Sequence, residues 1–205
     1  MHPDYVLKLA CEVRSTLWGV EHWGVSALEE CSSRIVNGPL AGQFLSQVMP
    51  TLSLLFKVID AKERPSLQVH PNEKTAPLTG GKPKTEMWCM LEDGEFFAGF
   101  KPGVTRQDVE RALESGGLED MLVRHCGRKG DVFLIPGGLV HAIGDKTLLY
   151  EVQQGSTTTF RFHDWGRLDR TGKPRTLNIR ESLIALDLSL PLPVAQKDID
   201  RKSVV

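Results

Sequence analysis

Gly130–Ile143 is the stretch that most limits how this chain can fold, because two short strand-forming runs there flank a tight turn. The first run, Asp131–Ile135, is mostly apolar and rich in residues that favour strands. Pro136-Gly137-Gly138 follows, and such a turn offsets a strand sharply because proline presets φ and glycine tolerates positive φ. The second run, Leu139–Ile143, carries His141 among apolar neighbours. The sequence therefore predicts that the turn presents His141 inward at the start of a strand, where a lone histidine is more often a core residue than a ligand.

The spacing of this stretch resembles the second sequence motif of the cupin superfamily. In that motif glycine is followed by five residues, proline, one residue, glycine, two residues and histidine, which Gly130, Pro136, Gly138 and His141 match. Asp145 stands where the motif usually ends in asparagine. The resemblance implies a mainly β cupin jelly roll, or double-stranded β-barrel, with a metal at the barrel mouth.

The composition describes an ordinary globular chain of 205 residues, of which 40% are hydrophobic and 25% charged. We expect a single cupin domain over residues 1–188, and we hold open that the tail 189–205 is the start of a missing second β domain. The net charge of −1 gives no field that would attract nucleic acid or a membrane surface.

Targeting and cysteine patterns favour a cytoplasmic enzyme. The sequence shows neither a signal-peptide pattern after Met1 nor an apolar run of membrane-spanning length. The cysteines are widely spaced and form no CxxC pair, which favours reduced core thiols over a disulfide framework or a zinc finger. They are Cys11, Cys31, Cys89 and Cys126.

Hydrophobic periodicity predicts a chain of strands interrupted by helices near its middle and its end. Strands are expected at residues 5–13, 52–60, 67–70, 85–91, 95–100, 148–153 and 157–162. Thr105 and Asp108 have the spacing of a capping box, and a second short helix is expected after Leu118, which together predict a small helical insertion over about residues 104–126. Asn178–Leu186 has the spacing of a C-terminal helix.

Four residue positions predict a metal site. Gln68 and His70 are two apart and so point to the same face of a strand, which a shared metal would explain, although a solvent-facing edge strand is the alternative. Glu86 begins the next predicted strand, and His141 completes the set. Imidazoles, one carboxylate and an amide oxygen suit one Zn²⁺ per chain, with Fe, Mn or Co as alternatives. Because glutamine is neutral, the ion would keep a net charge near +1 and act as a strong Lewis acid.

Lys57 interrupts a mostly apolar predicted strand. Burying an unpaired lysine is costly, so either the strand lies at a sheet edge, where the lysine reaches solvent, or Lys57 belongs to a site. The sequence favours neither alternative.

Several motifs in order resemble the type I mannose-6-phosphate isomerases, most closely the short bacterial form. The resemblance runs from about Trp18 to Leu186 and is carried by Ser66–Pro71, Lys84–Trp88, Ile135–His141 and Gln153–Arg167. It implies a cytoplasmic, monomeric or dimeric enzyme of carbohydrate metabolism that interconverts mannose 6-phosphate and fructose 6-phosphate at one zinc, through a cis-enediol. A small sugar phosphate is then the only partner expected.

The resemblance also implies roles for individual residues. It assigns the zinc ligands to Gln68, His70, Glu86 and His141, and it places Lys57, Lys84 and Arg161 in the pocket with Ser66 and Trp18 beside them. Arg161 suits stabilisation of the enediolate or the phosphate, and Lys84 suits proton transfer or phosphate binding. As an alternative, Arg161 pairs with Glu151 or Asp164.

The chain departs from the family pattern at a few positions. Thr157 replaces an acidic residue four positions before Arg161, and Val20 and Gly24 differ near Trp18. The loss at Thr157 and the short C-terminus motivate a rival hypothesis, a non-catalytic metal-binding cupin that binds a sugar phosphate as sensor or regulator. An Fe(II) cupin oxygenase is a weaker third reading, because Gln68 occupies a ligand position and the basic residues suit a phosphate.

Overall fold

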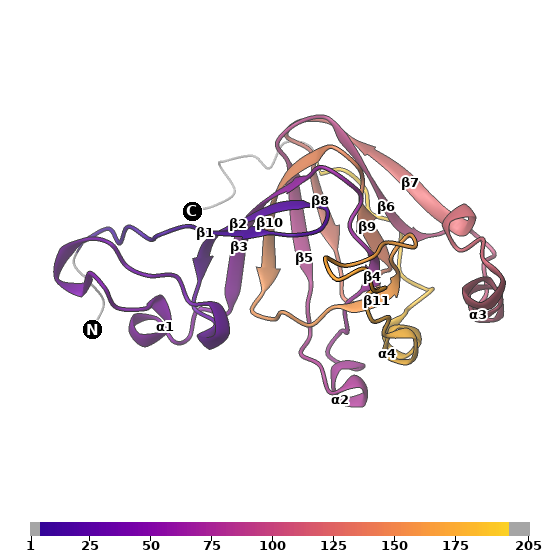
Figure 1. Cartoon of the computed structure of the whole chain (residues 1–205), viewed down its shortest axis with the longest axis horizontal. Helices are drawn as coiled ribbons and strands as arrows, with labels where there is room; N and C mark the ends of the chain where they lie inside the picture. The colour runs from indigo at the N-terminus through magenta and orange to yellow at the C-terminus, as the bar shows by residue number, and fades with distance from the viewer. Residues whose placement is uncertain (1–4, 197–205) are drawn as a thin grey trace.

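The protein is described by a computed structural model, and the structure describes residues 5–196. The fold consists mainly of two antiparallel β-sheets (Figure 1). The six-stranded sheet has the order β1 (Glu12–Ser15), β2 (Gly19–Ser26), β3 (Leu54–Ala61), β10 (Thr147–Gln154), β5 (Glu86–Met90) and β8 (Val132–Ile135). The five-stranded sheet has the order β11 (Phe160–His163), β4 (Leu67–Val69), β9 (His141–Ile143), β6 (Gly94–Phe100) and β7 (Leu122–Gly127).

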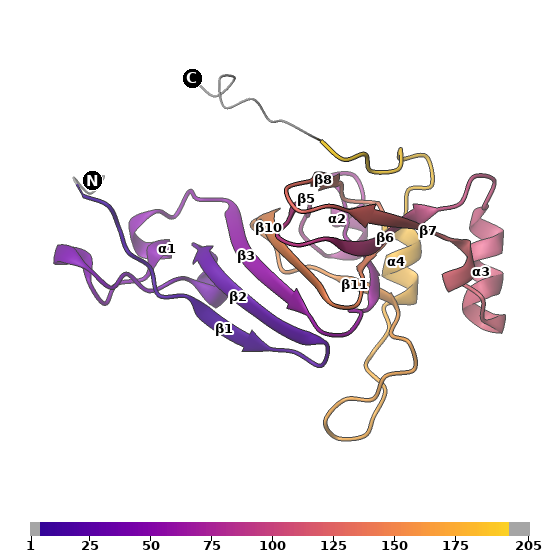
Figure 2. The same cartoon turned by 90° about the horizontal axis from the view of Figure 1, so that it is seen from above.

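Short helices join and flank these sheets. The α-helices are α1 (Leu45–Val48), α2 (Ala76–Thr79), α3 (Arg106–Ser115) and α4 (Ile179–Ala185). Single 3₁₀ turns occur at η1 (Glu29–Cys31), η2 (Gly38–Leu40) and η3 (Glu119–Met121). In Figure 2, β1 and β2 extend the larger sheet on one side of the barrel, and α3 and α4 lie on the other side.

Alternation along the strands builds the barrel interior. Residues of β10 alternate between buried and half-buried, so that Leu149 and Glu151 point inward while Tyr150 points outward. Trp88 of β5 and Phe96 of β6 meet between the sheets, with ring centroids 5.5 Å apart. The structure confirms the predicted double-stranded β-barrel of the cupin type.

The Pro136-Gly137-Gly138 turn carries the chain from β8 in one sheet to β9 in the other. A Cβ atom on Gly137 would lie 2.7 Å from the Pro71 carbonyl oxygen, so only glycine fits there. Gly138 has a φ of +101°, and its N–H donates to the His70 carbonyl over 2.8 Å. The turn is therefore fastened to the end of β4, and His141 lies fully buried as predicted.

The helical insertion is shorter than predicted. Helix α3 begins with the expected capping box, in which the Thr105 N–H donates to Asp108 over 2.8 Å. The predicted second helix is only the turn η3. Residues 122–126, which the sequence places in the insertion, belong to strand β7 instead. Residues 122–127 pair with β6, where Arg124 lies opposite Phe97, and this pairing decides their conformation.

Two other expectations about the chain were wrong. Regular strand structure begins at Glu12 rather than at residue 5, because Leu9 makes only an isolated bridge to Ile35. Cys11 and Cys126 are exposed, so they are not core thiols, whereas Cys31 is buried.

The segment that follows α4 packs back onto the barrel. Leu190 and Ala195 contact the core around Trp88, and the Gln196 N–H donates to the Val132 carbonyl over 2.8 Å. The domain boundary at residue 188 stays a prediction. None of the helices in residues 5–196 has the length and hydropathy that a membrane span requires.

Candidate metal centre and adjoining cavity

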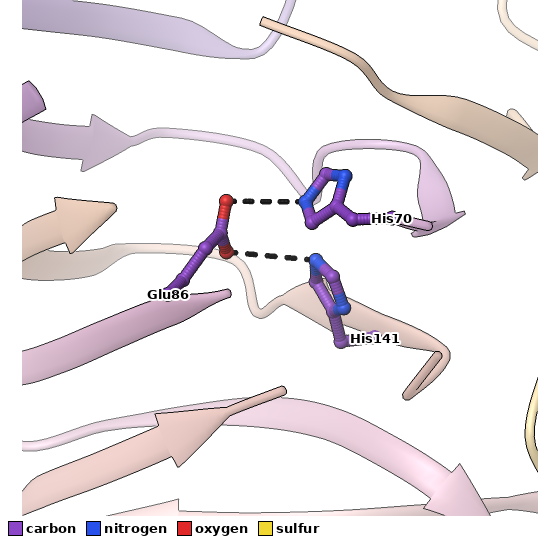
Figure 3. Close-up of side chains that lie close together, drawn as sticks. All are labelled: His70, Glu86 and His141. Atoms are coloured by element: carbon purple, nitrogen blue, oxygen red, sulfur yellow. Dashed lines mark ion pairs between the residues drawn. The ribbon is translucent and has the colours of Figure 1, made fainter. Parts of the chain in front are cut away.

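Three buried side chains from different strands converge inside the barrel (Figure 3). His70 follows the last residue of β4, Glu86 begins β5, and His141 begins β9. Their candidate ligand atoms all lie within 4.8 Å of one another. His70 Nε2 is 3.1 Å from Glu86 Oε1, and His141 Nε2 is 3.7 Å from Glu86 Oε2. The structure thus brings together three of the four predicted metal ligands.

Gln68, the fourth predicted ligand, lies beside them. It pairs directly with His141 across β4 and β9, and its amide Nε2 is 3.3 Å from His141 Nε2. A half-turn of the amide brings Oε1 to the same place, so Gln68 can offer an oxygen ligand. Because β4 lies between β11 and β9, the edge-strand alternative for Gln68 and His70 is wrong.

The hydrogen bonding of the cluster fits a bound cation. His141 Nδ1 is 2.8 Å from the Leu139 carbonyl oxygen and donates to it, which leaves a lone pair on Nε2 toward Glu86. Both ring nitrogens of His70 and Oε2 of Glu86 are buried without a hydrogen-bond partner in the described part of the chain. Buried polar atoms are rarely left unpaired, and a metal would satisfy several of these at once.

The protonation states also suit metal ligands. Burial lowers the pKa of His70 to about 3 and lowers the pKa of His141, so both imidazoles are neutral near pH 7. Burial opposes ionisation of Glu86, but the Lys84 ammonium and the two imidazoles outweigh it and hold the pKa of that carboxyl well below its usual value. The site therefore offers two neutral imidazoles and one carboxylate, a donor set typical of zinc.

A cavity of about 580 Å³ adjoins the cluster. Gln68 and Glu86 line it, and so do the other residues that sequence reasoning placed in the pocket, namely Trp18, Lys57, Ser66, Lys84 and Arg161. Lys84 lies at the metal end of the cavity, with its Nζ 2.7 Å from Glu86 Oε1.

Lys57 is a buried, paired residue of the cavity wall. It lies on β3, between β2 and β10, so the edge-strand interpretation was wrong. Its Nζ is 3.1 Å from Glu151 Oε1 and 3.6 Å from Glu21 Oε2. Burial disfavours its charge, yet the two carboxylates outweigh burial and raise the pKa of Lys57.

Arg161 faces the cavity from β11 without either of the acidic partners considered from the sequence. Its Nη1 donates to the Thr176 carbonyl over 2.8 Å, whereas Asp164 accepts from Arg175 Nε over 2.6 Å. Among the described residues, Arg161 forms no ion pair with Glu151 or Asp164. Burial and the neighbouring Arg175 guanidinium lower the pKa of Arg161. Arg170 and Arg175 also line the cavity, and the three arginines are together called its cationic wall here.

Sequence reasoning missed Glu21 and Glu151 as cavity residues. Glu151 is buried, its Oε2 accepts from Trp88 Nε1 over 3.0 Å, and its Oε1 faces the Lys57 ammonium. Burial is the main reason that the pKa of Glu151 is raised. Side chains of a strand alternate between its two faces, which is the argument used for Gln68 and His70. The same alternation along β10 could have identified Glu151 as an inward-facing residue.

The departure at Thr157 lies outside this cavity. Thr157 is exposed, with its hydroxyl 3.5 Å from Glu30, and it is not among the residues that line the cavity. The loss of the acidic residue at Thr157, which motivated the non-catalytic alternative, therefore does not concern a group that faces the candidate metal.

Known proteins resemble this chain in sequence and in fold. No protein-family model matches it. It is 36% identical over 180 residues to GmuF of Bacillus subtilis, a probable mannose-6-phosphate isomerase, covering 80% of this chain and 57% of that protein. It is 33% identical over 189 residues to the mannose-6-phosphate isomerase ManA of the same organism, covering 83% of this chain and 60% of ManA.

Solved structures agree with this relationship. The structure of a mannose 6-phosphate isomerase from Bacillus subtilis matches with a TM-score of 0.84 and 26% identity, over 91% of this chain and 70% of that one. A mannose 6-phosphate isomerase bound with zinc and yttrium shares the fold, with a TM-score of 0.67 and 16% identity over 91% of this chain and 76% of that one. The chain is thus a homologue of the mannose-6-phosphate isomerases and spans between 57% and 60% of the length of the two Bacillus subtilis relatives compared by sequence.

Proposed function

We propose that the chain is a zinc-dependent aldose–ketose isomerase that interconverts mannose 6-phosphate and fructose 6-phosphate. The observation that carries this proposal is the buried His70–Glu86–His141 cluster beside a cavity that three arginines also line. The homologues named mannose-6-phosphate isomerase support the choice of substrate.

The residues present fit a zinc ion. Gln68, His70, Glu86 and His141 would hold it, and the unpaired buried atoms of His70 and Glu86 are the observation that supports this fit. When bound, zinc supplies Lewis-acid polarisation of the sugar oxygens at C1 and C2. Zinc is also one of the two metals named for a solved isomerase of the same fold.

The isomerisation moves a proton between C1 and C2 of the open-chain sugar through a cis-enediol. Glu151 is our candidate for the group that takes and returns this proton, because its buried carboxyl lines the cavity and its raised pKa suits proton transfer. Lys84, beside Glu86, suits proton transfer to the oxygens or stabilisation of their developing negative charge. Lys57 is already paired with Glu151 and Glu21, so we assign it to holding Glu151 in place rather than to the phosphate.

The phosphate binds, in this proposal, at the arginine side of the cavity. The guanidinium groups of Arg161 and Arg175 are close enough to influence each other's charge, and Arg170 lines the same wall. A guanidinium group can donate two parallel hydrogen bonds to the oxygens of a phosphate. The negative charge of the phosphate dianion also compensates the repulsion between neighbouring guanidinium groups. Ser66 and Trp18 line the cavity as neutral contacts for the sugar.

Formation of fructose 6-phosphate from mannose 6-phosphate by the purified chain, measured in a coupled assay, tests the proposal. Glu151→Gln should keep the fold and the zinc but lower kcat by about 10² or more, as removal of a general base does. Glu12→Gln, an exposed residue outside the cavity, is the matched control. A folded chain with full zinc content that forms no product contradicts the enzyme and favours the sugar-phosphate sensor. The cytoplasm as compartment and a monomer or homodimer as assembly stay predictions from the sequence.

A further inference from the structure

The cationic wall of the cavity depends on one loop between β11 and α4. This segment, Asp164–Arg175, is defined here as the arginine loop, and Figure 2 shows that the connection between β11 and α4 projects from the barrel. Asp169, Arg170, Thr171 and Arg175 of the loop line the cavity. A projecting loop needs fixed anchors if its arginines are to stay in place, because exposed loops are otherwise mobile.

The arginine loop is closed upon itself at its base and at its tip. Asp164 and Arg175, its first and last residues, form a two-pronged ion pair, with Arg175 Nε 2.6 Å from Asp164 Oδ2. At the tip, the Asp169 carboxylate accepts hydrogen bonds from the backbone N–H groups of Thr171 and Lys173 over 2.8 and 3.0 Å. These contacts fix the shape of the loop but do not fix its position on the barrel.

Trp165 and Arg64 make the connection to the barrel. The Arg64 guanidinium lies between two aromatic rings, 4.7 Å from the Trp165 ring centroid and 4.5 Å from that of Phe97 in β6. Trp165 Nε1 donates to the Pro65 carbonyl over 2.6 Å, and Arg167 donates to the Arg64 carbonyl. Arg64 is itself held by an ion pair with Glu119.

The backbone conformation of Trp165 indicates that its surroundings hold the ring against Arg64. Its φ is +56°, in the left-handed region that side chains other than glycine rarely adopt. Residues remain in that region where the surrounding contacts determine their conformation. Here the ring contacts Arg64 and also packs edge-on against His163, with ring centroids 5.0 Å apart.

We propose that Trp165 and Arg64 are positioning residues that hold the arginine loop over the cavity and so set the affinity for the phosphate group of the ligand. Neither residue lines the cavity, whereas Pro65 and Ser66, which follow Arg64, and Arg170 and Arg175 of the loop do. The contacts of Trp165 with Arg64 and Pro65, called the clamp here, thus join two segments that line the cavity, the one before β4 and the arginine loop. The inference rests on the proposed function for the nature of the ligand, a phosphorylated sugar.

Binding of inorganic phosphate, measured by titration calorimetry on the purified chain, tests the clamp independently of turnover. Trp165→Ala should weaken phosphate binding about tenfold, equivalent to roughly 1.4 kcal/mol. Trp165→Phe keeps a ring over Arg64 but loses the N–H donor, and it should fall between Trp165→Ala and the wild type. Leu168→Ala, an exposed position in the same loop, is the matched control and should bind phosphate as the wild type does. The zinc content should be equal in all variants.

The kinetic readout is a rise in KM for mannose 6-phosphate that exceeds the fall in kcat. Phosphate affinity of Trp165→Ala equal to that of the wild type overturns the clamp, and so does a loss as large in Leu168→Ala. A wild-type chain that binds no phosphate overturns it as well. If Trp165→Ala does not fold, Arg64→Lys decides in the same way, because lysine keeps the charge but not the planar stacking. A wild-type chain that binds phosphate but has no isomerase activity would overturn the proposed function. The clamp would still be supported if Trp165→Ala then bound phosphate more weakly than the wild type.

Discussion

Nε2 of His70 lies 3.1 Å from Oε1 of Glu86, and the side chains of both residues are 1% exposed. Both nitrogens of this imidazole are buried without a hydrogen-bond partner among the described residues. A buried carboxylate beside a neutral, unpaired imidazole is costly in a protein interior unless another group joins them. A shared cation is the group that the surrounding residues fit.

Replacing the anionic member of the cluster should remove the metal. Glu86→Gln leaves only neutral ligands, so we expect zinc and isomerase activity to be lost together. The change also leaves the buried Lys84 without its partner, which should cost about 3–5 kcal/mol of stability. Elemental analysis and urea unfolding measure the two effects, and Glu73→Gln, at an exposed position, is the control. Stoichiometric zinc in Glu86→Gln would contradict the ligand assignment.

The stability of the metal-free chain should fall as the pH is lowered from about 6.5 toward 3. His70 has a folded-state pKa of about 3, well below its usual value of 6.5, so in this range the unfolded chain binds the proton and the folded chain does not. The lowered pKa of Glu86 acts in the same direction below its usual value of 4.5. Each pKa unit corresponds to about 1.4 kcal/mol.

Thermal unfolding of chelator-treated protein across this pH range checks the linkage. His70→Asn should make the curve less steep, because one of the groups that gain a proton on unfolding is gone, while His141 and Glu86 remain. His22→Gln, on β2 outside the cluster, is the control for removing a histidine elsewhere. Equal pH dependence in His70→Asn and the wild type would show that His70 is not the responsible group.

Arg161→Ala should separate catalysis from metal binding. Arg161 pairs with Gln68 across β11 and β4 but is not itself a proposed ligand, so the zinc content should stay that of the wild type. Loss of a cation that stabilises the reacting oxygens or the phosphate should lower kcat/KM by about 10²–10³. Arg180→Ala, at an exposed position in α4, is the control for removing a surface arginine. An unchanged kcat/KM would remove Arg161 from the mechanism.

Gly137→Ala tests how the turn before β9 positions His141. The added Cβ would lie 2.7 Å from the Pro71 carbonyl oxygen, so the turn or the end of β4 must move. We expect a loss of about 1–3 kcal/mol in the free energy of unfolding, as for other overpacked sites, together with weaker zinc binding. Gly24→Ala, whose Cβ would come no closer than 3.9 Å to its surroundings, should stay within about 0.5 kcal/mol of the wild type. Equal effects of the two substitutions would contradict this role of the turn.

Much of the fold and of the metal cluster could be predicted from the sequence, because both depend on local patterns. The alternation along the strands predicted a mainly β chain and the turn predicted the inward histidine, whereas the barrel was implied by the resemblance of Gly130–His141 to the cupin motif. The predicted helical insertion failed at residues 122–127, where pairing with β6 overrides the local pattern. Such long-range pairing is not visible in a single segment of sequence.

The remaining features of the cavity depend on strand register and on a long loop. Lys57 meets Glu151 because β3 and β10 pair in a particular register, which the spacing of either strand does not reveal. Likewise, Trp165 contacts the segment at Arg64 and Pro65 across about a hundred residues of sequence. The left-handed backbone conformation of Trp165 is not predicted by any sequence pattern that we identified. These contacts needed the tertiary structure.

Zinc content measured together with isomerase activity tests the central claim most directly. The purified chain should contain a single equivalent of zinc, lose both metal and conversion of mannose 6-phosphate to fructose 6-phosphate after treatment with a chelator, and regain both when zinc is restored. Full activity in a chain shown by elemental analysis to be free of metal would contradict the claim that His70, Glu86 and His141, with Gln68, form the metal centre of an isomerase.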